Sequence, residues 1–147
     1  MADIPFGQRA VPMLAYEDVG LAVERLGAMF GFVEHGERFA DPDGTVTHAE
    51  VELGGALIVL GDPGRAYQNP DRHARDCAAA RHWLEAPNVV DGALIYVDDV
   101  AACIMRAREN GATILRDLEA QPFGRLFVAA DHEGHRWMFL QPPATAS

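Results

Sequence analysis

The stretch that decides the fold of this chain is Asp131-His132-Glu133-Gly134-His135-Arg136-Trp137-Met138-Phe139-Leu140. An Asp followed three residues later by Gly is typical of a tight turn, because the Asp side chain can accept hydrogen bonds from the backbone ahead and Gly tolerates a positive φ angle. The run from Arg136 to Leu140 predicts a largely buried strand after this turn. A weaker copy of the stretch ends at Leu60, about eighty residues earlier, which indicates two similar halves.

The first half reads as strand, helix and three strands. Residues 11–16 are apolar and predict a short strand, and Asp18 is a good helix N-cap. Apolar residues then recur at helical spacing from Val19 to Phe30, and Gly31 supplies a stop. Three further strands are expected at 32–40, 45–53 and 56–61.

The second half repeats this pattern. A strand is expected at 93–97, a cap at Asp99, a helix ending at Asn110-Gly111, and strands opening at 112 and spanning 125–130 and 136–140. The landmarks match at nearly constant offsets: 81 between the two Asp caps (99 minus 18) and 79 between Gly55 and Gly134 (134 minus 55). We interpret this as an internal duplication.

The chain is therefore expected to be one domain, 1–147, with a first module at about 11–61, a linker at 62–91 and a second module at about 92–141. The linker contains several prolines and an Ala-rich middle at 78–80 that can form a short helix. Linkers of this length in compact domains are often lids or binding segments.

Composition limits the classes of partner. The chain has 147 residues, 49% of them hydrophobic, and a formal net charge of −10. The acidic balance argues against nucleic acid, which requires a basic face, and against anionic membranes. Because no signal peptide and no membrane-spanning run is evident, we expect a cytoplasmic protein. Cys77 and Cys103 are expected to be free thiols.

The duplicated unit, closed by Asp131-x-x-Gly134-His135-Arg136-Trp137, resembles the vicinal oxygen chelate superfamily, the group of glyoxalase I, extradiol dioxygenases, and bleomycin- and fosfomycin-resistance proteins. The resemblance spans residues 11–141. It implies an α+β fold in which two tandem βαβββ modules form curved sheets around an open cavity. It also implies a homodimer with sites near or across the subunit boundary, but one fold hosts many chemistries.

The resemblance places the metal ligands of the family's enzymes on the first and last strands of each module. In this chain those positions hold Val11, Val59, Gly92 and Met138. Zinc, iron and manganese require imidazole, carboxylate or thiolate ligands, which these residues do not provide. Only a shift of the alignment to Asp91 would supply a ligand, so we expect neither a metal nor another cofactor.

Strand alternation predicts which side chains face the hollow between the modules. It predicts that His48 and Glu50 of the third strand face the hollow. It also predicts that Arg125 and Phe127, on the strand that begins at Arg125, face the hollow. The predicted ligand-binding residues are Val11, Met13, His48, Glu50, Leu57, Val59, Trp83, Tyr96, Arg125, Phe127 and Met138. A mostly apolar wall with a few polar groups is typical of a small-molecule pocket.

Some of these side chains have two interpretations. His48 and Glu50 are either an acid–base or displaced metal pair, or a solvated pair. Arg125 pairs either with an anionic ligand or with Glu50, and Tyr96 either meets a ligand or packs in the core. Trp83 either closes over a ligand or anchors the linker. The histidines outside the strands, His73, His82, His132 and His135, are expected on the surface of loops and turns.

The sequence supports three hypotheses for function. In the first, a metal-free member of the superfamily binds a mostly apolar small molecule, such as an antibiotic-like compound, without chemistry. In the second, a lyase, isomerase or dioxygenase uses a relocated metal or the His48/Glu50 pair. In the third, a structural or regulatory dimer fills its hollow with its own side chains.

Overall fold

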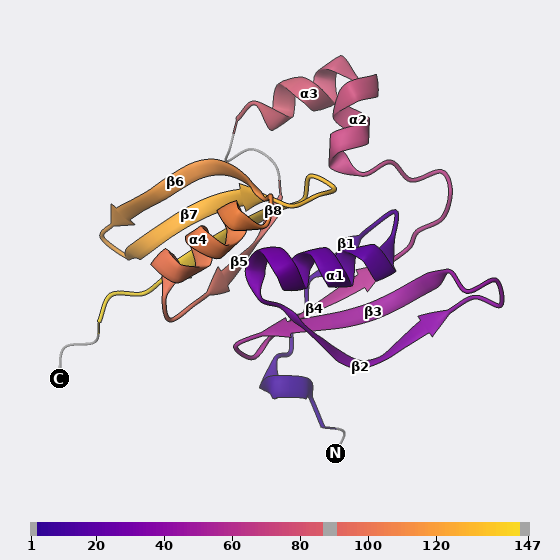
Figure 1. Ribbon diagram of the computed structural model, residues 1–147, viewed down its shortest axis with the longest axis horizontal. Helices are drawn as coiled ribbons and strands as arrows, with labels where there is room; N and C mark the ends of the chain where they lie inside the picture. Colours follow the sequence, from indigo (N-terminus) through magenta and orange to yellow (C-terminus); the bar gives the residue numbers. More distant parts are fainter. Residues whose placement is uncertain (1–2, 87–90, 145–147) are drawn as a thin grey trace.

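The computed structural model describes residues 3–86 and 91–144. The first module contains β1 (Met13–Ala15), α1 (Val19–Phe30), β2 (Val33–Ala40), β3 (Val46–Leu53) and β4 (Ala56–Gly61). The second contains β5 (Gly92–Tyr96), α4 (Val100–Glu109), β6 (Thr113–Gln121), β7 (Gly124–Ala130) and β8 (Arg136–Gln141). Figure 1 shows the two modules side by side, which confirms the expected α+β fold of two βαβββ units.

The two sheets have the same topology. Their strand orders are β1-β4-β3-β2 and β5-β8-β7-β6. In each sheet the first strand pairs in parallel with the last, as in the registers Met13 to Val59 and Leu94 to Met138, and the other neighbours are antiparallel. The repeated strand order agrees with the duplication that the sequence indicates.

The two long helices begin in the same way. The Asp18 side chain accepts a hydrogen bond from the Leu21 N–H at 2.9 Å, and the Asp99 side chain accepts one from the Ala102 N–H at 3.0 Å. Each cap satisfies a backbone donor that has no partner within the helix. Gly31, at φ 87°, ends α1 in the left-handed conformation that glycine adopts without steric cost.

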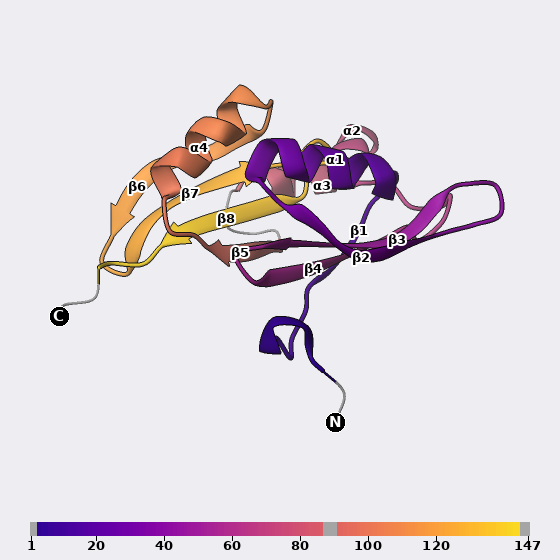
Figure 2. The same ribbon diagram turned by 60° about the horizontal axis from the view of Figure 1, so that its bottom comes forward.

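One core is shared by the modules. Both α1 and α4 lie on the same side of the sheets (Figure 2), and the helix-facing side chains of both sheets meet beneath them. Phe30 of α1 packs across the module boundary, with its ring centroid 4.9 Å from that of Phe139 and 5.9 Å from that of Trp137. Trp137 has no exposed surface, which confirms its expected core position.

The linker forms two short helices, α2 (Pro70–Asp76) and α3 (Ala78–Leu84), which project from the rest of the molecule (Figure 1). Residues 87–90 of the expected linker lie outside the described residues. A short 3-10 turn, η1 (Pro5–Gly7), precedes β1. None of the described helices is long and apolar enough to cross a membrane. Cys77 and Cys103 are both unpaired, as expected.

Candidate functional site

The face of each sheet opposite its helix is termed here the open face. On the open face of the first sheet, the Glu50 carboxylate lies between two imidazoles. His35 Nδ1 is 3.0 Å from one Glu50 oxygen, and His48 Nε2 is 3.7 Å from the other. His48 and Glu50 therefore share a face, as strand alternation predicts, and all three side chains are partly exposed. The sequence did not indicate His35 as the third member of this group.

The N-terminal segment covers part of the same face. The Gln8 side-chain amide accepts a hydrogen bond from the Leu57 N–H at 2.8 Å and donates one to the Leu57 carbonyl at 3.0 Å. The ring of Phe6 lies 5.4 Å from that of His35. Leu57 is consequently buried, because the N-terminal segment of the chain itself covers this part of the open face.

Other predicted residues of this face are accessible. Met13 on β1 is 78% exposed, and its register partner Val59 on β4 is half-buried. Val11, just before β1, is also half-buried. The open face of the first sheet thus combines an exposed thioether with the polar group around Glu50.

The open face of the second sheet is apolar. Leu126, Val128 and Leu140 form a hydrophobic cluster there, with Leu115 and Met138 packed against it. Beside them on β5, Leu94 is 48% exposed and Tyr96 is 65% exposed. Of the two interpretations of Tyr96, core packing is therefore wrong, because the ring projects from the open face into solvent.

The predicted positions of Phe127 and Arg125 are wrong. Phe127 is fully buried on the helix side of β7, where its ring stacks on that of Phe139 at 5.1 Å. Arg125 shares that side of the strand, opposite Gln141 at the exposed end of the sheet, and no ion pair joins it to Glu50 among the described residues. Strand β7 is apolar on both faces, so the alternation of its side chains could not show which of them face the helix.

Trp83 lies away from the open faces. It lines a groove between α2 and α3, and its side chain is 59% exposed. The linker is held at both ends. On one side, Arg72 and the N-cap residue Asn69 both donate hydrogen bonds to the Glu17 carboxylate. On the other, Arg136 donates to the carbonyl oxygens of Leu84 and Ala86.

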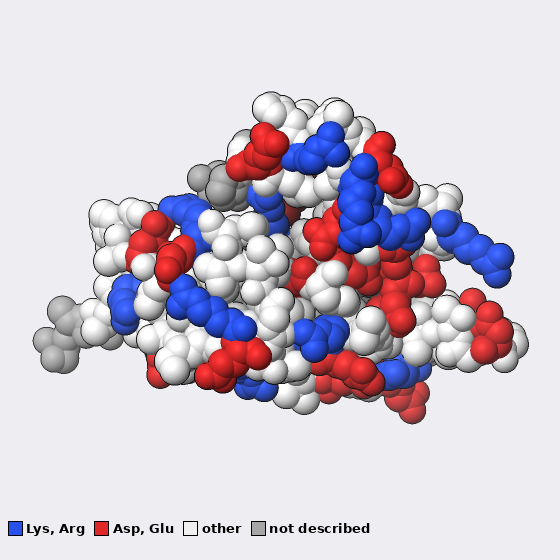
Figure 3. All heavy atoms as spheres, turned by 45° about the horizontal axis from the view of Figure 1, so that its top comes forward, with Lys and Arg blue, Asp and Glu red and all other residues white. Residues whose placement is uncertain are grey.

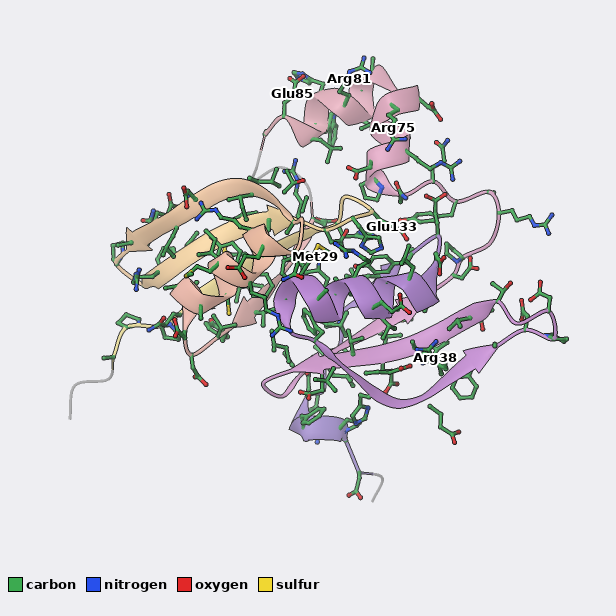
Figure 4. The ribbon with its side chains drawn as sticks, viewed as in Figure 1. Met29, Arg38, Arg75, Arg81, Glu85 and Glu133 are labelled. Atoms are coloured by element: carbon green, nitrogen blue, oxygen red, sulfur yellow. The ribbon has the colours of Figure 1, made fainter. Side chains whose placement is uncertain are left out.

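The turn at 131–134 forms a buried joint between the modules, which the sequence did not reveal. Asp131 accepts a hydrogen bond from the Tyr16 hydroxyl at 2.6 Å and from Trp137 Nε1 at 3.0 Å. The Glu133 carboxylate accepts the backbone N–H of Glu17 at 2.8 Å. Figure 4 shows Glu133 beside the end of α1 that follows β1.

The two histidines of this turn are only partly exposed and pack into the joint, so the expectation of solvated turn-surface side chains is wrong. His135 Nε2 lies 2.5 Å from the Ala15 carbonyl oxygen, and its ring packs on Tyr16. His132 stacks on the other side of the joint, with its ring 6.0 Å from that of Tyr16. Among the described residues, neither ring nitrogen of His132 has a hydrogen-bond partner, although both are buried.

Burial dominates the electrostatics of the joint. It lowers the pKa of His132, although the carboxylates of Asp131 and Glu133 oppose this shift. It raises the pKa of Glu133, against the effect of the backbone N–H of Asp18. Burial and the neighbouring Asp131 carboxylate raise the pKa of Tyr16 well above its ordinary value. Figure 3 shows acidic and basic side chains gathered together between the linker helices and α1, so this region is not a face of one charge.

A family model for the glyoxalase/bleomycin resistance protein/dioxygenase superfamily matches residues 12–139. The chain belongs to this superfamily. An uncharacterized protein of Mycobacterium bovis is 31% identical over 132 residues, which are 89% of this chain and 81% of the relative.

Solved structures of other proteins share the fold. TioX from Micromonospora sp. ML1 is 28% identical with a TM-score of 0.67, and the match covers 95% of this chain and 100% of TioX. TnmS3, an antibiotic binding protein from Streptomyces sp. CB03234, is 18% identical with a TM-score of 0.57, and the match covers 92% of this chain and 98% of TnmS3. At that identity the likeness to TnmS3 shows the fold alone.

The residues of this superfamily member do not fit the metal that the family's enzymes use. The resemblance places two of the family's ligand positions at Val59 and Met138. These residues lie on the last strands of their modules, β4 and β8, and offer no ligand for a hard cation. In the part of the chain that the structure describes, no group of three or more His, Cys, Asp and Glu is arranged to hold a metal ion. The group of His35, Glu50 and His48 is therefore not arranged to hold a metal ion either.

Proposed function

We propose that this superfamily member binds a mostly apolar small molecule on the open faces of its modules, sequestering an antibiotic-like compound without a metal ion. The observation that carries the proposal is the apolar open face of the second sheet. There Leu94 and Tyr96 remain exposed beside the cluster formed around Met138. Exposed apolar side chains that adjoin one another mark ligand or partner sites. TnmS3, which has the same fold, is an antibiotic binding protein, and this supports the ligand class.

A second copy of the chain completes the proposed site. The open faces lie on the side of the sheets away from α1 and α4 (Figure 2), and apart from the part that the N-terminal segment covers, one chain leaves them exposed. A homodimer in the cytoplasm that brings two open faces together would enclose the ligand between an apolar wall and the polar group around Glu50. Enclosure of this kind is usual for small-molecule sites.

A pair of matched variants tests the proposal. Leu94, on the open face, is 48% exposed, and Leu21, on α1, is 42% exposed. The neutral fluorophore N-phenyl-1-naphthylamine serves as the probe, titrated under conditions where its fluorescence reports binding. Leu94→Glu should weaken binding by at least tenfold, about 1.4 kcal/mol, because the carboxylate loses water when the ligand binds. Leu21→Glu should leave binding unchanged. Equal affinities of the two variants would refute the proposal.

The alternative is an enzyme that uses His48 and Glu50 as an acid–base pair or with a relocated metal. The position of Glu50 between His35 and His48 favours the acid–base form. Elemental analysis of the purified protein checks the metal form. One divalent metal per chain that is lost in Glu50→Gln would favour the enzyme, whereas substoichiometric metal in both proteins would favour binding alone.

A further inference from the structure

The helices α2 and α3 enclose a groove that is distinct from the open faces. Its volume is about 470 Å³, within the range of roughly 300–1,000 Å³ that is usual for small-molecule sites. Its lining residues come from both helices and from the segment that precedes them: Tyr67, Gln68, Pro70, His73, Cys77, Ala79, Ala80, Trp83 and Leu84.

The lining contains no permanently charged side chain. The groove presents three aromatic rings, those of Tyr67, His73 and Trp83, and contains no Lys, Arg, Asp or Glu. The charged side chains of Arg81 on α3 and of Glu85, which follows α3, point away from the sheets (Figure 4). The Asp76 carboxylate does not line the groove and already accepts a hydrogen bond from the lining residue Gln68 at 2.7 Å. A charged ligand would lose water here without gaining an opposite charge from the lining, whereas a flat aromatic ligand gains stacking surface.

The groove is held in shape by both modules. The Tyr67 hydroxyl donates a hydrogen bond to the Ala15 carbonyl of β1 at 3.0 Å, which fixes the ring beside the first module. Arg136 of β8 donates to the Ala86 carbonyl at 2.8 Å and also to that of Leu84, which fixes the end of α3 beside the second. A site whose walls are anchored independently of the ligand needs little rearrangement to bind it.

The two helices that form the groove do not bury a hydrophobic core between them. Neither α2 nor α3 contains a buried residue, and each has only seven residues. Isolated helices of this length are marginal in water. At 1.5 Å per residue each is about 10 Å long, so the groove offers far less than the roughly 800 Å² per partner that a stable dimer interface needs. A small molecule therefore fits the groove better than a second copy of the chain does.

We propose that the α2–α3 groove is a second binding site, which takes a flat, neutral aromatic molecule stacked on Trp83. The His73 imidazole, whose side chain makes no hydrogen bond to the other described residues, supplies a polar contact that orients the ligand. This site acts independently of the open faces.

The intrinsic fluorescence of the protein tests the proposal. Of the two tryptophans, Trp137 is fully buried and Trp83 is 59% exposed, so Trp83 reports on the groove. N-phenyl-1-naphthylamine, which is flat, aromatic and neutral, should quench the Trp83 emission saturably. Ala80→Phe, which fills the groove, should weaken this quenching at least tenfold. Ala78→Phe on the same helix, outside the lining, should leave it unchanged. Far-UV circular dichroism verifies that both variants keep their helices.

Two results would overturn the groove site. One is equal quenching of the Ala80→Phe and Ala78→Phe proteins. The other is dissociation of a dimer by Ala80→Phe in sedimentation velocity, which would make a second copy the occupant. Leu94→Glu separates this proposal from the proposed function, because it should spare Trp83 quenching while it weakens binding at the open face. Loss of all probe binding in Leu94→Glu, with none lost in Ala80→Phe, would refute the groove alone.

Discussion

Arg25 of α1 and Arg106 of α4 each donate hydrogen bonds to backbone carbonyls at the C-terminal end of the other helix. Arg25 of α1 donates to the Asn110 carbonyl at the end of α4, at 2.6 Å. Arg106 of α4 donates to the carbonyls of Gly27 at 3.0 Å and Ala28 at 3.2 Å near the end of α1. The two arginines are 81 positions apart (106 minus 25), the same offset as the two Asp caps. A cation at a helix C-terminus satisfies free carbonyls and interacts favourably with the helix dipole.

Replacement of either arginine should weaken the contact between the modules. Arg25→Met and Arg106→Met should each lower the free energy of unfolding by about 1 kcal/mol, since each removes charged hydrogen bonds to helix-end carbonyls that are partly exposed. Urea denaturation measures the change. Arg65→Met, at an exposed position in the linker, serves as the control and should be nearly neutral. A control as destabilised as the other two variants would contradict the interpretation.

Gly134 and Gly44 offer a matched test of the buried joint. Their φ angles are 92° and 90°, so alanine is strained at both positions. A Cβ at Gly134 would also lie 2.6 Å from Oδ1 and 2.9 Å from the backbone N of Asp71, whereas nothing lies within 4 Å at Gly44. Gly44→Ala should cost about 1 kcal/mol of stability and Gly134→Ala about 2–4 kcal/mol. Equal costs in thermal or chemical unfolding would show that α2 moves aside freely.

His132 should make stability depend on pH. Burial lowers its pKa below the ordinary value of 6.5, so the native state holds the neutral imidazole and the unfolded chain takes up a proton first. The stability that the neutral imidazole contributes is fully present above pH 6.5, and it is lost as the pH falls through the lowered pKa of His132. Glu133, whose pKa is raised, contributes with the opposite sign at the acidic end, so only a difference between variants isolates His132.

Comparison of the wild type with His132→Phe isolates the effect of His132 on the pH dependence of stability. The variant should lose less stability than the wild type between pH 7 and pH 5. It should also be more stable at the lower pH, because Phe leaves no buried ring nitrogen without a hydrogen-bond partner in the joint. Unfolding by urea at a series of pH values gives the comparison. His82→Phe makes the same substitution at an exposed histidine of α3 and serves as the control. If the slope of His132→Phe equals those of the wild type and of the control, His132 does not titrate as its burial implies.

Arg136 should hold the linker helices in place. Arg136→Met removes the donors to the carbonyls at the end of α3, so amide hydrogen exchange in Ala78–Leu84 should accelerate at least tenfold. Exchange in the buried strand β7 should change much less. Arg125→Met, at the exposed end of β7, is the control and should leave exchange in α3 unchanged. Uniform acceleration over the whole chain would instead indicate global destabilisation.

Local patterns predicted the strands that have a polar and an apolar face. In β3 the alternation of His48 and Glu50 with Ala49 and Val51 gave the correct orientation, because only one face carries polar residues. In β7 the same reasoning put Phe127 on the wrong face. That strand is buried on both sides, so the position of its side chains is set by its register with β8 and not by its own sequence.

The sequence by itself determined the Asp caps, the glycine stop of α1 and the turn at 131–134, because each depends on residues close together in the chain. It also determined the duplication, because these local patterns recur at nearly constant offsets. Only the tertiary structure decided that the turn is a buried joint and that the linker helices form a groove. The Tyr16 hydroxyl and the Asp131 carboxylate that it contacts are 115 residues apart. No local pattern records which distant segment will exclude water from a polar side chain, and that exclusion fixes the pKa of Glu133 and of His132.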